Sequence, residues 1–340
     1  MVVTLLNKAH SKKMNFFNQK ILLTILLLLL SKLSFALDNP QNYPSRPIHI
    51  IIPLAAGNSI DNGVRIITQK ITQNTGMQFV IESLPGAAGS IGADKVAKSA
   101  PDGYTLGVFN DSILTMVPNI QTSIPWDPLK DFSSITIAGK IELGLIVPPT
   151  SPANSAADLI NFAKKNPGKL NYGSGGNGSP QHIAMALFNS QANTVMTHVP
   201  YKGIMQAATG VAGGEVDVAL IAVSSLKNLA EAGKLKFLGV ASQQRLAQFP
   251  NIPTISESGL PGFEFTAWFA FMAPQGTPKQ IIDLLNSEIK KALLDKDVRD
   301  KMLMQGLYPG SNSPDELTQL IRKQLSSYGA LIKKIGLKAE

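Results

Sequence analysis

The sequence predicts an α/β protein made of two lobes. Short apolar strands alternate with helical patterns between residues 48 and 109, and a second series of the same kind runs from residue 155 to residue 241. Such alternation is typical of parallel sheets with helices on both faces. Two longer apolar stretches, residues 135–147 and 267–273, separate and follow these series. We expect them to be extended segments that cross from one lobe to the other.

The N-terminus, residues 1–36, has the pattern of a secretory signal peptide. A strongly apolar run at residues 21–30 has the length of a signal core, and Ser34 and Ala36 provide the small residues of a cleavage site. An uncleaved anchor helix is the alternative, but Lys32 interrupts the run, which is shorter than the roughly 20 residues of a bilayer span. We therefore expect export and cleavage after about Ala36.

Composition excludes several classes of function. The 340 residues include no cysteine, so disulfides, thiolate nucleophiles and cysteine metal sites are excluded. The four histidines are scattered, so we expect no metal site. We also expect no cofactor. Removing the five lysines of the leader lowers the formal charge from +8 to +3. Without a basic stripe and interleaved aromatic residues, we also expect no nucleic acid partner.

The first glycine loop follows a strand predicted at residues 48–52. Pro53 ends this strand because proline has no N–H for a sheet ladder. Ser59 is a favourable N-cap, and Asp61 falls in the first turn of the helix that follows. A loop of this kind presents backbone N–H groups at a helix N-terminus, which is a general anion site, although most such connections bind nothing.

The remaining elements follow in chain order. Strands are predicted at residues 78–82, 105–109, 169–172, 197–200, 217–222, 236–241 and 267–273, and helices at residues 93–100, 156–166, 181–189 and 206–212. Two further helices close the chain, opened by Thr277-Pro278 and by the capping box of Ser313 and Glu316. We assign residues 37–140 and 267–340 to lobe 1 and residues 141–266 to lobe 2, so the chain would finish on the first lobe.

A second glycine loop, residues 173–179 (GSGGNGS), precedes a helix whose start is marked by Ser179 and Pro180. The loop matches GxGxxG, but the residues about 20 positions later include no acid for a ribose hydroxyl. A dinucleotide site is therefore disfavoured. The glycines are better suited to bring bare backbone close to an anion.

Ser179 and His182 offer the elements of a nucleophile and a base, since a helix N-terminus lowers the pKa of a histidine. No third group that would orient the histidine can be named, so a capping or packing role for His182 is favoured. An exported Ser/His hydrolase and a ligand sensor remain the alternatives. Two glycine loops, one per lobe and each opening a helix, favour a cleft that closes over a small anion.

Nine short motifs follow one another along the mature chain. They are YPSRPI (43–48), PLAAGNSID (53–61), PGAAG (85–89), APDGYTL (100–106), KLNYGS (169–174), HVPYKG (198–203), AGKL (232–235), GLPGF (259–263) and APQGTP (273–278). Each is weak alone, but their order and spacing are specific. In them the sequence resembles the Bug-type extracytoplasmic solute receptors, the substrate-binding proteins of tripartite tricarboxylate transporters.

This resemblance implies a type II periplasmic binding protein, a Venus flytrap of two α/β lobes joined by two crossover strands. It implies a monomeric periplasmic receptor, not an enzyme, that delivers a small carboxylate to a membrane permease. The ligand contacts that it implies are Ala56, Gly57, Asn58, Ile60 and Asp61 in the first lobe, and Ser174, Gly175, Asn177, Gly178 and Ser179 in the second.

Two departures from the family pattern bear on the ligand. The first loop is usually Pro-Phe-x-Pro-Gly-Gly-x-x-Asp, and several positions differ here: Leu54, Ala55, Ala56 and Asn58. We expect the added amide of Asn58 to change how water is placed. Ile221 stands where the family often has a cleft-facing aspartate, which would pair with an ammonium group. We therefore expect an unaminated mono- or dicarboxylate.

Overall fold

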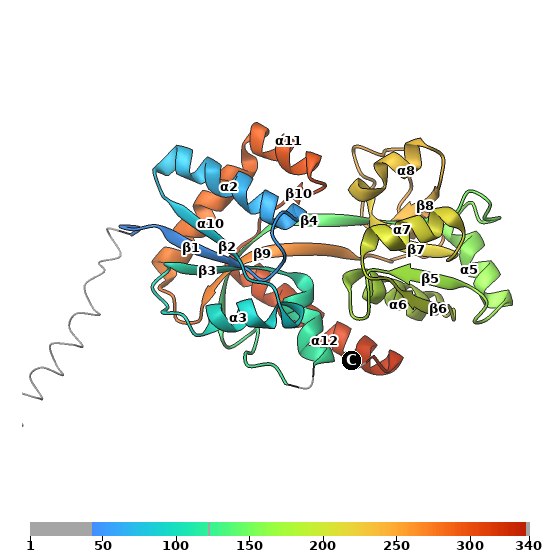
Figure 1. Cartoon of the computed structure of the whole chain (residues 1–340), viewed down its shortest axis with the longest axis horizontal. Coiled ribbons are helices and arrows are strands. Elements are labelled where there is room, and N and C mark those ends of the chain that lie inside the picture. The colour runs from blue at the N-terminus through green and yellow to red at the C-terminus, as the bar shows by residue number, and fades with distance from the viewer. Residues whose placement is uncertain (1–42, 122, 338–340) are drawn as a thin grey trace, which may run out of the picture. The chain divides into compact units, whose positions relative to one another are not determined.

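The structure is a computed structural model that describes residues 43–121 and 123–337 (Figure 1). The predicted signal peptide lies outside the described residues. The chain divides into an N-terminal unit, residues 1–45, and a compact body that begins at Arg46. The body is described below. Within the part of the chain that the structure describes, no helix has the length and apolar character needed to cross a membrane.

Ten strands of the described chain form one mixed sheet. Its main order is β2-β1-β3-β9-β4-β7-β5-β6, and β8 and β10 pair with β4 outside this path. The strands are β1 (Ile48–Ile52), β2 (Phe79–Ser83), β3 (Thr105–Asn110), β4 (Phe132–Val147), β5 (Asn171–Ser174), β6 (Thr197–Pro200), β7 (Val218–Ala222), β8 (Lys236–Val240), β9 (Thr266–Pro274) and β10 (Tyr308–Pro309).

Two long antiparallel strands, β4 and β9, connect the halves of this sheet. From Phe132 to Glu142, β4 pairs with β9, and from Leu143 onward it pairs with β7 and β8. The parallel strands β1, β2 and β3 lie beyond β9, whereas the parallel strands β5, β6 and β7 lie beyond the end of β4. The prediction of two α/β lobes joined by two extended segments is confirmed.

Helices cover both faces of the sheet, as predicted. In the first lobe, α2, α10 and α11 lie on one face and α3 and α12 on the other (Figure 1). The helices are α2 (Ser59–Thr75), α3 (Ser90–Ala97), α4 (Val117–Ile120), α5 (Ala156–Lys165), α6 (Pro180–Ala192), α7 (Ile204–Gly213), α8 (Lys227–Glu231), α9 (Ile255–Ser258), α10 (Lys279–Leu294), α11 (Lys296–Met304) and α12 (Pro314–Ile335).

The start of α2 corrects one prediction, because Asn58 rather than Ser59 is the N-cap. The side-chain Oδ1 of Asn58 accepts hydrogen bonds from the backbone N–H groups of Ile60 at 2.8 Å and Asp61 at 3.1 Å. An amide oxygen satisfies the same orphan donors as a serine hydroxyl would, so the cap moves back by one residue. Asp61 lies in the first turn, as predicted.

The C-terminal part differs from the prediction in two respects. A third helix, α11, lies between the two expected ones, with Asp295 as its N-cap. In addition, α12 does not finish on the first lobe. Its first half packs with Phe109 and Trp268 through Leu317 and Ile321. Its second half joins the core of the other lobe through a different set of side chains, Tyr328, Leu331 and Ile332.

Candidate functional site

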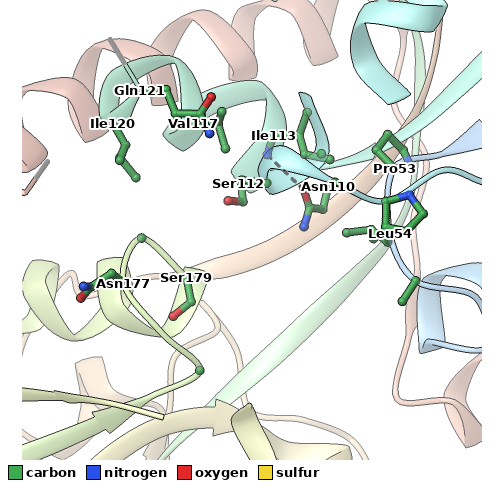
Figure 2. Close-up of a pocket in the computed structure, with 17 residues that line it drawn as sticks. Pro53, Leu54, Asn110, Ser112, Ile113, Val117, Ile120, Gln121, Asn177 and Ser179 are labelled. Carbon is green, nitrogen blue, oxygen red and sulfur yellow. Dashed lines mark hydrogen bonds between the residues drawn. The ribbon is translucent and has the colours of Figure 1, made fainter. Parts of the chain in front are cut away.

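A cleft of about 640 Å³ lies where the loops of the two lobes face each other (Figure 2). One wall follows the carboxyl ends of β1, β2 and β3, which meet at one edge of the parallel sheet, where ligands of such folds generally bind. The other wall is the loop between β5 and α6. The lining residues are Pro53, Leu54, Ala55, Pro85, Gly86, Ala88, Gly89, Asn110, Ser112, Ile113, Val117, Ile120, Gln121, Gly175, Asn177, Gly178 and Ser179.

The first-lobe wall is mostly apolar. Ile113, Val117 and Ile120 recur at spacings of four and three along a π-helical turn, η3 (Ser112–Met116), and the α4 helix that continues it. Figure 2 shows Ile120 pointing toward Asn177 and Ser179 on the opposite wall. This wall can therefore pack against the hydrocarbon part of a ligand.

Asn110 and Ser112 supply polar groups to the same wall. Oδ1 of Asn110 accepts a hydrogen bond from the backbone N–H of Ile113 at 3.0 Å. This contact fixes the orientation of the amide, and its Nδ2 donor lies on the side that faces the second lobe (Figure 2). An N–H donor in this position can bind an anionic oxygen.

The five predicted first-loop contacts (Ala56, Gly57, Asn58, Ile60 and Asp61) are not among the residues that line the cleft. Asp61 is 3% exposed, and its Oδ2 accepts a hydrogen bond from the backbone N–H of Gly57 at 2.9 Å. Its other oxygen lies 3.1 Å from the guanidinium of Arg65. The side chains of Asp61 and Asn58 thus accept hydrogen bonds from backbone N–H groups of the loop itself, so these N–H groups are not free for a ligand. In this conformation Asp61 and Asn58 shape the loop.

The second-lobe wall contains four of the five residues predicted there: Gly175, Asn177, Gly178 and Ser179. Ser179 is the N-cap of α6, as predicted, and its Oγ accepts a hydrogen bond from the N–H of His182 at 3.3 Å. The fifth residue, Ser174, is fully buried, and its hydroxyl lies 2.6 Å from Nε2 of His198. Ser174 therefore shapes the loop from behind.

Gly178 lies close to Ile120 of the opposite wall. Its φ of +70° lies in the left-handed region that glycine adopts without strain. A Cβ atom on this residue would lie 2.8 Å from Cδ1 of Ile120. A side chain here would be strained and would also press against the opposite lobe.

His182 does not have the arrangement of a catalytic base. Its Nδ1 accepts a hydrogen bond from the backbone N–H of Gly178 at 3.2 Å, and burial, with a smaller contribution from nearby His198, lowers its pKa to about 4. Ser179 uses its Oγ as a backbone cap. The contacts of the described residues thus give His182 the packing role that the sequence favoured.

None of the described side chains that line the cleft is charged. A carboxylate bound there would be held by amide, hydroxyl and backbone donors, which can satisfy an anion without a cationic partner. In the described part of the chain, no group of three or more His, Cys, Asp or Glu side chains is arranged to hold a metal ion.

The model of the tripartite tricarboxylate transporter family receptor, TctC, matches residues 64–337. The chain belongs to this family. It is a family of solute-binding receptors, and the resemblance to the Bug-type receptors is confirmed.

Curated and solved relatives match the TctC chain over most of its length. A UPF0065 protein of Pseudomonas sp. strain P51 is 35% identical over 298 residues, which cover 87% of this chain and 88% of that protein. The structure of R. palustris Rpa4515 with adipate is 30% identical, with a TM-score of 0.74 and coverage of 87% and 99%. MatC from Rhodopseudomonas palustris with bound malate is 28% identical, with a TM-score of 0.70 and coverage of 85% and 100%. The periplasmic binding protein BugD is 28% identical, with a TM-score of 0.70 and coverage of 88% and 100%.

One position inferred from the family pattern does not face the cleft of this TctC protein. Ile221 lies on β7, is fully buried, and packs in an apolar cluster with Ile146 and Val211. The reason given above for an unaminated ligand is therefore wrong. The absence of carboxylates among the lining residues supplies a different reason, because an ammonium group would find no charged partner there.

The sequence analysis missed the contribution of the second and third strands to the first wall. Asn110 is the last residue of β3, Ser112 follows shortly after it, and residues 85–89 follow β2. Both strands were predicted, and the carboxyl ends of parallel strands share one edge of a sheet. Applying this rule to all three strands would have identified these residues. The apolar spacing of Ile113, Val117 and Ile120 was a second available signal.

Proposed function

We propose that this protein is an exported periplasmic receptor that captures a small carboxylate in the cleft and delivers it to the permease of a tripartite tricarboxylate transporter. The observation that carries the proposal is the set of neutral donors on facing walls, Asn110 and Ser112 opposite Asn177 and Ser179, in a cleft without charged side chains. The signal-like N-terminus and the family's receptor role support export and delivery.

Closure of the lobes would couple binding to delivery. A ligand held by both walls gains its full set of contacts only when the walls approach, so it favours the closed state. β4, β9 and α12 cross between the lobes and are the elements that such a motion would bend. The predicted contacts Ala56, Gly57, Asn58, Ile60 and Asp61 stay proposals for this closed state.

The ligand class that we propose is an unaminated mono- or dicarboxylate. The cleft has no carboxylate to pair with an ammonium group, whereas its apolar wall suits a hydrocarbon body. Two solved relatives hold ligands of this class, adipate in one and malate in the other. An amino acid that binds more tightly than every simple carboxylate would contradict this assignment.

The decisive experiment is mass spectrometry of small molecules released by denaturing the protein purified from the periplasm, followed by calorimetric titration of the refolded protein. We expect a carboxylate that rebinds at one site per chain and is recovered unchanged. Asn110→Ala should weaken its binding by roughly tenfold because one hydrogen bond to a charged group is lost. Asn161→Ala, on the exposed face of α5, is the matched control and should have no effect.

The hydrolase alternative predicts a different outcome in the same experiment, whereas the sensor alternative is distinguished by a search for its partner. An exported hydrolase would return a chemically altered compound, and Ser179→Ala would abolish that conversion. A sensor would bind the same ligand but would pass the closed state to a signalling partner instead of a permease. Failure of every carboxylate to bind or to raise the melting temperature would overturn the receptor proposal.

A further inference from the structure

Two histidine rings lie stacked behind the glycine loop of the second lobe. His182 of α6 and His198 of β6 have ring centroids 3.7 Å apart and planes inclined by 18°. Tyr172 of β5 stacks on the other side of His198 at 5.0 Å. Neither histidine lines the cleft, and both line a second cavity of about 560 Å³.

Each ring makes one polar contact with the glycine loop. Nδ1 of His182 accepts the backbone N–H of Gly178 at 3.2 Å, and Nε2 of His198 lies 2.6 Å from Oγ of Ser174. The same Oγ accepts the N–H of Gly176 at 3.1 Å. The stack thus holds the loop at both ends, and at Gly178 it holds a residue that lines the cleft.

The bond to Gly178 requires a neutral His182. A ring nitrogen that accepts an N–H donor must present a lone pair, so the ring proton of His182 is on Nε2. The next proton would have to bind Nδ1, and it would remove the acceptor that holds Gly178. His198 differs, because the Ser174 hydroxyl can turn and accept a hydrogen bond from an Nε2–H group instead of donating one to Nε2.

The surroundings keep the pair neutral. Burial lowers the pKa values of both histidines, that of His182 to about 4, and His198 adds to the lowering for His182. The other titratable side chains lining the cavity behind the stack are Tyr172 from β5 and Lys334 from α12. Among the described residues no carboxylate lines this cavity, so the described structure places no opposite charge beside an imidazolium there.

We propose that the neutral His182–His198 stack positions the glycine loop for ligand binding, and that a proton on Nδ1 of His182 releases Gly178 and loosens this wall of the cleft in acid. The role in ligand binding rests on the proposed function, whereas the support of the loop does not. Both histidines are positioning residues, because neither lines the cleft.

The test is a titration of the ligand-free mature protein by NMR from pH 8 to pH 3, following the ring nitrogens of His182 and the backbone amide of Gly178. Wild type should show the Nε2–H tautomer at pH 8, with both signals moving at one shared midpoint below pH 5. In His182→Asn, an uncharged Oδ1 replaces Nδ1, so the amide of Gly178 should stay unchanged over the whole range.

Two further variants separate positioning from simple packing. His182→Phe keeps a ring in the stack but has no acceptor, so its Gly178 amide should already have the acid-form shift at pH 8. His49→Asn, at the exposed position of the otherwise buried strand β1 in the other lobe, should behave as wild type. An Nδ1–H tautomer at pH 8, or a Gly178 amide that is the same in His182→Phe and wild type, would overturn the proposal. No ligand is needed, so the result is independent of whether a carboxylate binds.

Discussion

The two walls of the cleft are supported by different chemistry. Behind the first-lobe wall lie two buried carboxylates, Asp61 and Asp111, which are 3% and 1% exposed. Behind the second-lobe wall lie two imidazoles, His182 and His198. Burial raises the pKa of Asp111 and lowers the pKa values of His182 and His198, so the shifts behind the two walls have opposite directions. The walls should therefore respond oppositely to pH.

The first-lobe wall also contains a contrast between its two acids. Asp61 bonds the N–H of Gly57 and pairs with Arg65, as described above. Neither oxygen of Asp111 has a hydrogen-bond partner within the described structure, although the backbone N–H groups of Ser112 and Trp268 approach it. Burial raises the pKa of Asp111 to about 7, and the approaching N–H groups offset this only in part. Asp61 therefore has a hydrogen-bond donor and a cationic partner, whereas Asp111 has neither among the described residues.

The largest effect is expected for Asp111→Asn. In the unfolded chain this carboxyl loses its proton above about pH 3.8, whereas in the folded protein it keeps the proton up to about pH 7. Folding therefore becomes less favourable as the pH rises through this interval, by up to about 4 kcal/mol. The asparagine variant lacks this loss, so its unfolding free energy in urea should exceed that of wild type at pH 8.

The same variant has its own control in the pH dependence. Near pH 4 both proteins carry an uncharged group at position 111, and their stabilities should agree within about 1 kcal/mol. His182 contributes with the opposite sign, since its lowered pKa makes folding less favourable as the pH falls from 6.5 toward 4. If the difference in unfolding free energy between Asp111→Asn and wild type does not grow between pH 4 and pH 7, the two walls do not respond oppositely to pH.

A smaller loss is expected for Asp61→Ala. The substitution removes the acceptor of the Gly57 N–H and a negative charge at the N-terminus of α2, which together should cost about 2–3 kcal/mol of unfolding free energy. Asp61→Asn keeps an oxygen for Gly57 and should lose less than half of this. Urea unfolding at pH 7 measures both. Equal losses in the two variants would mean that the charge, and not the bond to Gly57, supports the loop.

Gly178→Ala should lower the unfolding free energy by about 1 kcal/mol, because alanine is strained at a positive φ. Gly168→Ala is a matched control, since Gly168 has a φ of +73° and a Cβ atom added there would have no atom within 4 Å. We expect similar losses of stability in the two variants. Only Gly178→Ala should weaken carboxylate binding, because its methyl group meets Ile120 across the cleft. Calorimetric titration with the recovered ligand distinguishes the variants.

Local patterns predicted most of the fold and one wall of the site. Apolar runs and capping residues identified the strands and the starts of α6 and α12, because those signals lie within a few residues of the structure that they specify. The role of Asp61 in holding Gly57 depends on the conformation of a loop. Asp111 lies beside α12, which packs on η3 from about 200 residues later in the sequence. Such long-range packing leaves no local pattern, so the sequence did not identify it.

The smallest expected effect is the difference in unfolding free energy between alanine variants of two serines on facing walls. Ser179→Ala removes the N-cap of α6 and should cost about 1 kcal/mol of unfolding free energy. Ser112→Ala removes a hydroxyl that the structure places on the cleft surface without a capping role, so the change in unfolding free energy should stay within about 0.5 kcal/mol. Both variants should weaken carboxylate binding if both hydroxyls contact the ligand, which calorimetry tests directly. A loss of affinity in Ser179→Ala alone would mean that the ligand is held by the glycine loop and that the first-lobe wall contributes mainly apolar contact.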